Sequence, residues 1–167
     1  MKRLLPLLLA VTCIYSPCNA AEDSSPVESA RLPVAADVTF VGTGLSFGTQ
    51  ITAAILQKIG CTYAIRDSET SSKLLKLVSA ARDISQADVD SRQKFEVRNK
   101  IVFHFKDTND ISVEFSQKFL NQSYLKGNWN STPVHLRNDL VEEVHATVKE
   151  SAAQQLNKDA PKSCGIF

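Results

Sequence analysis

Two runs of alternating apolar and polar residues lie close together near the middle of the chain. Alternation with a period of two predicts a strand that buries one face, and two such runs joined by a short polar segment predict an antiparallel pair. The segment 97–115 is therefore expected to form a β-hairpin at the centre of a sheet. The apolar positions of the two runs are Ile101, Phe103 and Phe105, followed by Ile111, Val113 and Phe115.

The register of this hairpin is predicted from the requirement that both apolar sets face the same core. We expect Phe105 opposite Ile111 and Phe103 opposite Val113, because a slip of one residue would turn one set to the other face. This pairing needs a loop of three or five residues. Asn109 is the residue best suited to a left-handed conformation there, because the loop contains no glycine.

Apolar residues at helical spacing predict three helices. The first begins at Leu45 or Phe47 and ends at Ile59, the second covers 67–82, and the third covers 139–156. The third has the clearest amphipathic pattern, with charged residues on the face opposite its apolar stripe.

These elements predict a single α+β domain over 37–167, built on a mainly antiparallel sheet centred on the 97–115 hairpin, with about three helices packed on one face. Short strands are also expected at 37–41 and 61–65. The alternative is a small α/β sandwich in which these two short strands pair in parallel. The segment 127–133 is rich in turn-forming residues and is predicted to be a loop.

The N-terminal residues have the pattern of a signal peptide. Lys2 and Arg3 precede an apolar run, and small residues precede a cleavage position near Ala20, so 1–20 is expected to be removed on export. The mature protein is then expected to be periplasmic or secreted. Residues 21–36 are rich in Ser, Pro and Ala and are predicted to be a flexible leader.

Export changes how the cysteines are interpreted. After signal-peptide removal two remain, Cys61 and Cys164, and an even pair in an oxidising compartment predicts one disulfide bond. Lipoprotein processing at Cys13 or Cys18 is the alternative, although the residues before them fit a lipid-attachment box poorly. No membrane span is expected in the mature chain.

The charge balance argues against nucleic acid or an anionic lipid surface as a partner. Without Lys2 and Arg3 the chain has 17 basic and 18 acidic residues, a net charge of −1. A near-neutral protein offers no electrostatic footprint for a polyanion.

A glycine pattern follows the first predicted strand. Gly42, Gly44 and Gly48, followed by a helix, a strand and Asp67, resemble the Rossmann dinucleotide-binding fingerprint, and the resemblance covers 37–67. It implies a phosphate-cradling turn and a nucleotide cofactor. The third glycine comes one place late, however, and the chain lacks further βαβ units. A tight strand-to-helix turn is therefore favoured, and no cofactor is predicted.

Catalytic and metal-binding patterns are not indicated. His104, His135 and His145 lack ligand spacing, and no metal is predicted. The paired carboxylates fit exposed charged segments, and no nucleophile motif stands in a convincing setting. The sequence therefore leans against an enzyme.

The single tryptophan lies in a different context, among polar residues of the predicted loop. Aromatic residues in such loops often anchor a partner, although they equally serve as a lid on the core. The predicted partner-binding residues are Trp129, Tyr124, Lys126, Asn128 and Asn130.

These observations favour an exported binding or accessory protein that acts by protein–protein interaction with a partner in the cell envelope or outside it. An inhibitor or immunity-type protein, or a secretion or envelope-assembly subunit, fits this description. The alternative is a small secreted hydrolase or transferase whose site is assembled from distant residues such as His104, His135 and Asp139.

Overall fold

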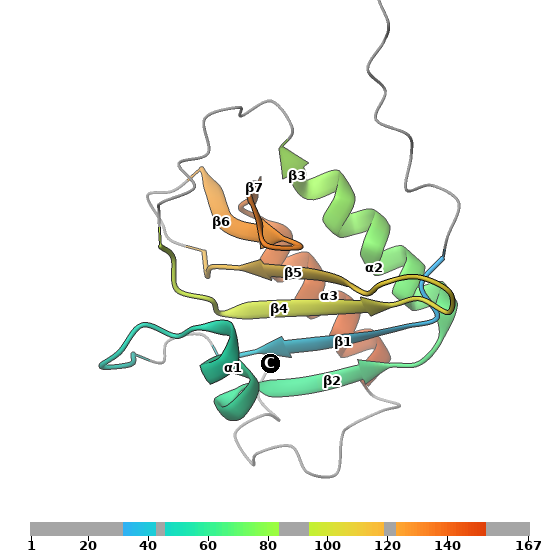
Figure 1. The fold of residues 1–167 in the computed structure, drawn as a ribbon, viewed down its shortest axis with the longest axis horizontal. Coiled ribbons are helices and arrows are strands. Elements are labelled where there is room, and N and C mark those ends of the chain that lie inside the picture. The colour runs from blue at the N-terminus through green and yellow to red at the C-terminus, as the bar shows by residue number, and fades with distance from the viewer. Residues whose placement is uncertain (1–31, 43–45, 84–93, 119–122, 153–167) are drawn as a thin grey trace, which may run out of the picture.

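Seven strands form one sheet, with two helices against one of its faces and a third helix beside the end of β1 (Figure 1). This computed structural model describes residues 32–42, 46–83, 94–118 and 123–152. The elements follow in the order β1 (Ala35–Phe40), α1 (Ala53–Ile59), β2 (Cys61–Ile65), α2 (Ser68–Ala81), β3 (Arg82–Asp83), β4 (Asn99–His104), β5 (Ile111–Phe115), β6 (Tyr124–Trp129), β7 (Thr132–Arg137) and α3 (Leu140–Ala152).

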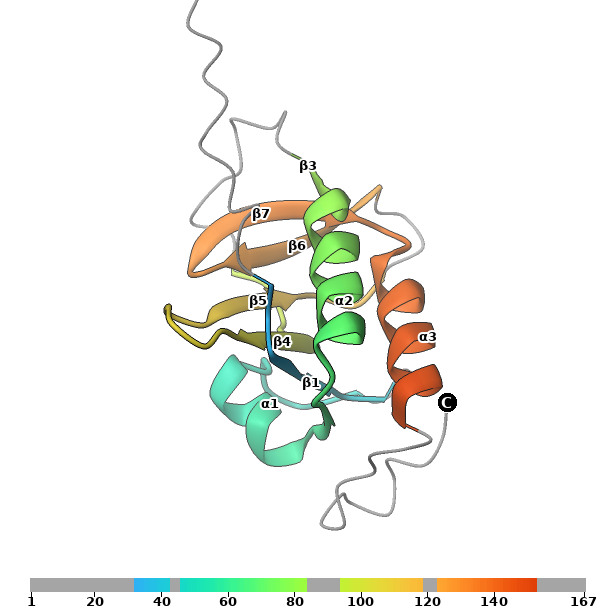
Figure 2. The same ribbon diagram turned by 90° about the vertical axis from the view of Figure 1, so that its right-hand side faces the viewer.

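The strands are arranged in the order β2-β1-β4-β5-β6-β7-β3, and every neighbouring pair is antiparallel. Helices α2 and α3 pack on one another and lie on the same side of the sheet (Figure 2). The predicted α+β class and the antiparallel sheet around the β4–β5 hairpin are confirmed. We call the side under α2 and α3 the helix face and the opposite side the open face.

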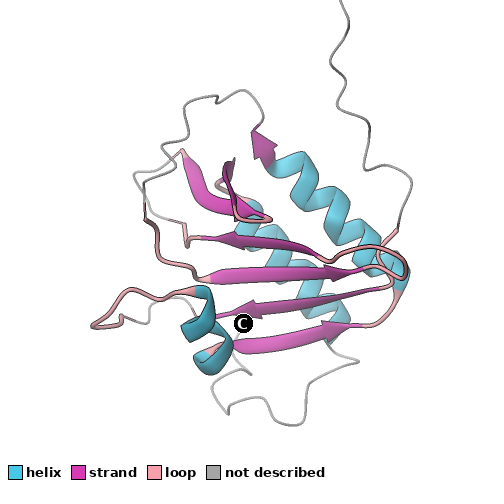
Figure 3. Cartoon of the chain, in the orientation of Figure 1, coloured by secondary structure: helices cyan, strands magenta, loops and turns pink. Residues whose placement is uncertain are grey.

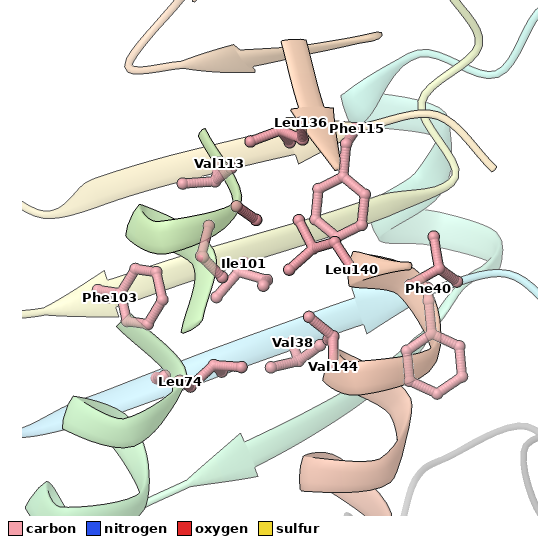
Figure 4. Packing of buried hydrophobic residues seen from close by; sticks show 14 of the residues in the cluster. Val38, Phe40, Leu74, Ile101, Phe103, Val113, Phe115, Leu136, Leu140 and Val144 are labelled. Carbon is pink, nitrogen blue, oxygen red and sulfur yellow. The ribbon is translucent and has the colours of Figure 1, made fainter. Parts of the chain in front are cut away.

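The main core lies between the helix face and the two helices (Figure 4). Every second strand residue points into it, as the period-two pattern predicts. Full burial of such side chains stabilises the fold by about 1.5–3 kcal/mol each. Strand residues of this core include Val38, Phe40, Ile101, Phe103, Val113, Phe115 and Leu136, and helix residues include Leu74, Leu140 and Val144.

Strands β1 and β2 run antiparallel, with Ala36 opposite Ile65 and Phe40 opposite Cys61. The alternative α/β sandwich, which required them to be parallel, is therefore wrong. The same pairing separates this segment from the dinucleotide-binding unit, in which the two strands around the helix are parallel. The glycine pattern is thus a resemblance in sequence and not in fold.

The β4–β5 hairpin has the predicted faces but not the predicted register. Phe103 lies opposite Ile111, and Ile101 lies opposite Val113, two residues away from the expected pairing. A slip of two residues keeps every side chain on its face, so the apolar pattern alone does not distinguish the two registers. Phe105 falls in the loop and packs at the edge of the core as a partly buried residue.

The prediction of a loop at 127–133 is wrong. Most of this segment belongs to β6 and β7, and only Asn130 and Ser131 form the turn between them. Both turn residues have positive φ, 48° and 68°, as in the tight two-residue turns that match the twist of a hairpin. The turn-forming residues therefore marked a hairpin rather than a long loop.

Helix α1 is shorter than predicted (Figure 3). It begins at Ala53, after Thr52, whose hydroxyl accepts a hydrogen bond from the Ile55 amide and so caps the helix. Residues 46–52 precede it without helical structure. Helix α1 packs on a separate small cluster, whose buried members are Val41, Ile51, Leu56 and Val97. The predicted end of the third helix, Leu156, lies outside the described residues.

Candidate functional site

The alternation of β6 divides the predicted partner-binding residues between two faces of the sheet. Tyr124, Lys126 and Asn128 are partly exposed on the open face, whereas Trp129 is only 6% exposed and belongs to the main core. The Arg82 guanidinium lies 5.5 Å from the centre of the indole ring. The position of Trp129 thus fits the alternative in which this side chain closes the core.

Asn130 has a structural task in the β6–β7 turn. Its side-chain oxygen Oδ1 accepts a hydrogen bond from the Ser112 backbone amide at 2.8 Å. The Asn130 backbone amide in turn donates to the Ser112 carbonyl at 2.8 Å. Asparagine also tolerates the left-handed backbone conformation better than most residues. The side chain therefore ties the turn to β5.

The open-face residues of β6 meet aromatic and basic residues of β7. Tyr124 lies opposite Arg137, Lys126 lies opposite His135, and the Tyr124 and His135 rings stack with centroids 3.9 Å apart. We call Tyr124, Lys126, His135 and Arg137 the outer patch. The patch combines a pair of stacked rings with two cations. Of its four residues, only Tyr124 and Lys126 on β6 were predicted from the sequence as partner-binding residues.

The cations of the outer patch differ in their surroundings. Arg137 pairs with Glu143 at 2.9 Å and with Asp139 at 3.4 Å, so its charge is compensated at the start of α3. Lys126 makes no ion pair with any residue that the structure describes. Its ammonium group can therefore bind an anionic group of another molecule without breaking an ion pair within the described part of the chain.

A second polar cluster on the open face was not predicted. His104, at the end of β4, lies between two carboxylates: its Nε2 is 3.0 Å from Asp37 Oδ2, and its Nδ1 is 2.7 Å from Asp110 Oδ2. Arg66 Nη1 lies 2.9 Å from the other oxygen of Asp37. We call Arg66, Asp37, His104 and Asp110 the His104 bridge, which joins β1, β4, the start of β5 and the β2–α2 connection.

The bridge controls the protonation of His104. Burial lowers the pKa of this imidazole, but the hydrogen bonds to Asp37 and Asp110 and the attraction of both carboxylates outweigh burial and raise it above 6.5. Because both ring nitrogens contact carboxylates, neither is left to take a proton from a substrate. In its protonated form His104 therefore links the two carboxylates, and in this arrangement it is not placed to act as a general base.

The residues suggested for a hydrolytic site are not brought together. Strands β5 and β6 lie between His104 on β4 and His135 on β7, a separation of roughly 14 Å at about 4.8 Å per strand. Asp139 pairs with Arg137 at the start of α3. This grouping of three residues does not form a catalytic site in the described part of the chain.

Cys61 is buried on β2 and takes part in a disulfide bond. Cys164, its predicted partner, lies outside the described residues, and so do the predicted signal peptide at 1–20 and residues 21–31 of the predicted leader. The leader was predicted to continue to Ala36, but Ala35 and Ala36 belong to β1. Within the described ranges, no group of three or more His, Cys, Asp or Glu side chains is arranged so that it could hold a metal ion. None of the helices described is long and apolar enough to cross a membrane.

Comparison of the chain with protein-family models, with curated proteins and with solved structures gave no match.

Proposed function

We propose that this chain is an exported binding or accessory protein that acts by contact with a protein partner in the cell envelope or outside it. The observation that carries the proposal is the open face: no described helix covers it (Figure 1), and the outer patch lies on it. A sheet that is packed on one side commonly presents its other side to water or to a partner. Such a surface is compatible with an inhibitor, an immunity-type protein or a secretion or envelope-assembly subunit.

The outer patch is the part of the open face best suited to a partner. Tyr124 supplies a ring that is already held by stacking on His135, so little side-chain freedom is lost on binding. Lys126 supplies an uncompensated cation in the described part of the chain. A partner segment that carries a carboxylate beside an apolar group complements this pair. Asn128, next along the same face, adds hydrogen-bonding groups.

The predicted export of the chain agrees with this proposal. The signal-peptide pattern at 1–20 and the predicted pairing of Cys61 with Cys164 are consistent with one another, because a disulfide persists in an oxidising compartment. Intact-mass measurement of the protein secreted from its full-length precursor checks both. Cleavage near Ala20 and a mass about two daltons below the reduced form are the expected results.

A capture experiment with two charge-reversal variants tests the function itself. The oxidised mature protein is used to capture partners from its own cell envelope, and bound proteins are quantified by mass spectrometry. Lys126→Glu is expected to abolish stoichiometric capture, because it places a carboxylate where the partner's carboxylate binds. Lys76→Glu, an identical charge change on an exposed position of α2, is the matched control and is expected to retain the partner.

Two results count against the proposal. Equal capture by both variants would remove the outer patch as the binding surface. The complete lack of a stoichiometric partner for the folded, oxidised protein would contradict the proposal that the chain is a binding protein.

A further inference from the structure

The His104 bridge contains an arrangement that only one protonation state of the imidazole satisfies. An ionised carboxylate offers acceptors and no donor, so a ring nitrogen that faces one must carry a proton. His104 faces Asp37 through Nε2 and Asp110 through Nδ1, at 3.0 and 2.7 Å. Both contacts are therefore hydrogen bonds only in the imidazolium form.

Loss of one proton breaks one of the two contacts. Neutral imidazole keeps a single N–H, and the other nitrogen then points a lone pair at a carboxylate. Asp37 has a second ionic contact, because Arg66 Nη1 lies 2.9 Å from its other carboxylate oxygen. Asp110 has a side chain that is 47% exposed, and it makes no other ion pair in the described part of the chain. Asp110 is thus the partner that separates.

We propose that the His104 bridge is a pH-operated clasp, which holds the β4–β5 loop against β1 and β4 when His104 is protonated and releases that loop when it is neutral. Asp110 is the last residue before β5, so its release frees one end of 105–110. The strands themselves remain paired, since β1 and β4 are joined by backbone hydrogen bonds, including one from the Val34 amide to the His104 carbonyl at 2.8 Å.

The surroundings of His104 contain few other charges that could take over its role. On the elements next to it, Asp37 faces it from β1, Asp110 from the start of β5, and Arg66 reaches Asp37 from the β2–α2 connection. On β4 itself, Lys100 is occupied by Glu114 at 3.2 Å. The raised pKa of His104 fits this geometry, because two carboxylates and one guanidinium leave a local excess of negative charge for the imidazolium to balance.

Nuclear magnetic resonance of the mature protein tests the clasp. The His104 ring is titrated, and the order of the 105–110 backbone, measured by nitrogen-15 relaxation of its amides, is followed in parallel. We expect a His104 midpoint above 6.5 and a loss of loop order with the same midpoint. The order of β4, measured in the same spectra, should remain constant through this range.

Three variants make the test specific. Asp110→Asn is expected to lower the His104 midpoint and to leave the 105–110 backbone with low order at every pH. His104→Gln should abolish the pH dependence of loop order. Asp107→Asn is the matched control and should change neither quantity, because Asp107 is an acidic residue of the same loop that makes no hydrogen bond or ion pair with His104 in the described part of the chain.

The proposal is overturned by any of three outcomes. These are a His104 midpoint at or below 6.5, loop order that does not follow the ring titration, and an effect of Asp107→Asn equal to that of Asp110→Asn.

Discussion

Strands β5 and β6 approach so closely at Gly127 that no side chain fits between them. A Cβ atom added at this position would lie 2.7 Å from the Glu114 carbonyl oxygen and 3.1 Å from Leu136 Cδ1. The first of these atoms belongs to the backbone of the neighbouring strand, so only a displacement of the strand could relieve the contact. This one residue therefore helps to fix the spacing of the sheet beneath the outer patch.

Gly127→Ala is expected to lower the free energy of unfolding by about 1–3 kcal/mol, the usual cost of forcing extra volume into a packed site. Urea denaturation at constant pH measures the loss. Gly48→Ala is the matched control, because a Cβ atom there meets nothing within 4 Å, and a change of less than about 0.5 kcal/mol is expected. Equal effects of the two substitutions would show that the close contact at Gly127 does not constrain the sheet.

At the scale of elements, the β6–β7 hairpin depends on a turn with two left-handed residues. Asn130 is suited to that conformation and is also bonded through its side chain to Ser112. Ser131, with φ of 68°, tolerates this conformation less well, and its side chain makes no hydrogen bond within the described part of the chain. A non-glycine residue in the left-handed region costs roughly 1–2 kcal/mol, so Ser131 is a strained position.

Ser131→Gly is expected to stabilise the protein by about 0.5–1 kcal/mol, because glycine removes the strain while adding some flexibility to the unfolded chain. Thermal unfolding provides the measurement. Asn130→Gly, at the neighbouring turn position, should bring no such gain, since it removes the hydrogen bond to Ser112. A Ser131→Gly protein that melts below the parent would contradict this account of the turn.

Elements with a regular apolar period could be predicted from the sequence. Strands β1, β2, β4 and β5 and helices α2 and α3 carry clear repeats of two or 3.6, and each appears close to its expected position. The β6–β7 hairpin was missed because Gly127, Asn128 and Pro133 are turn formers in isolation. Their strand conformation depends on neighbours across the sheet, which a local pattern does not contain.

The candidate sites also depend on contacts between residues far apart in the sequence, which a local pattern does not reveal. Tyr124 and Lys126 could be selected because they are polar and aromatic residues near one another in the sequence. The His104 bridge could not, since Asp37 is 67 residues from His104 and meets it only through the pairing of β1 with β4. Long-range strand pairing therefore determines which charges become neighbours.

For the molecule as a whole, protonation of two histidines on opposite sides of the sheet changes the folding stability in opposite directions. His104 on the open face has a raised pKa, as described above. His145 on α3 packs against Phe40 with ring centroids 4.5 Å apart. Burial lowers the pKa of His145, and the nearby Glu142 carboxylate offsets this only in part.

The sign of each contribution follows from linkage between protonation and folding. The raised pKa of His104 means that its stabilisation is complete below its ordinary value of 6.5 and is lost as pH rises through the folded-state pKa. The lowered pKa of His145 means that its stabilisation is complete above 6.5 and is lost as pH falls through the folded-state pKa. Together these two groups favour greatest stability near pH 6.5 in the range where carboxylates remain ionised.

Urea denaturation at about pH 5.5, 6.5 and 8, a window above the titration of Asp and Glu, tests this balance in the intact protein. His145→Phe keeps a ring beside Phe40 but cannot take up a proton, so its unfolding free energy should fall less than that of the parent between pH 6.5 and 5.5. For His104→Gln, the unfolding free energy should instead fall less than that of the parent between pH 6.5 and 8. A single linked proton changes stability by at most about 1.4 kcal/mol per pH unit, which sets the scale of each difference. The opposite result would be an unfolding free energy of the parent that only rises or only falls from pH 5.5 to 8, with the same pH dependence in both variants. It would show that neither histidine is linked to folding as the geometry requires.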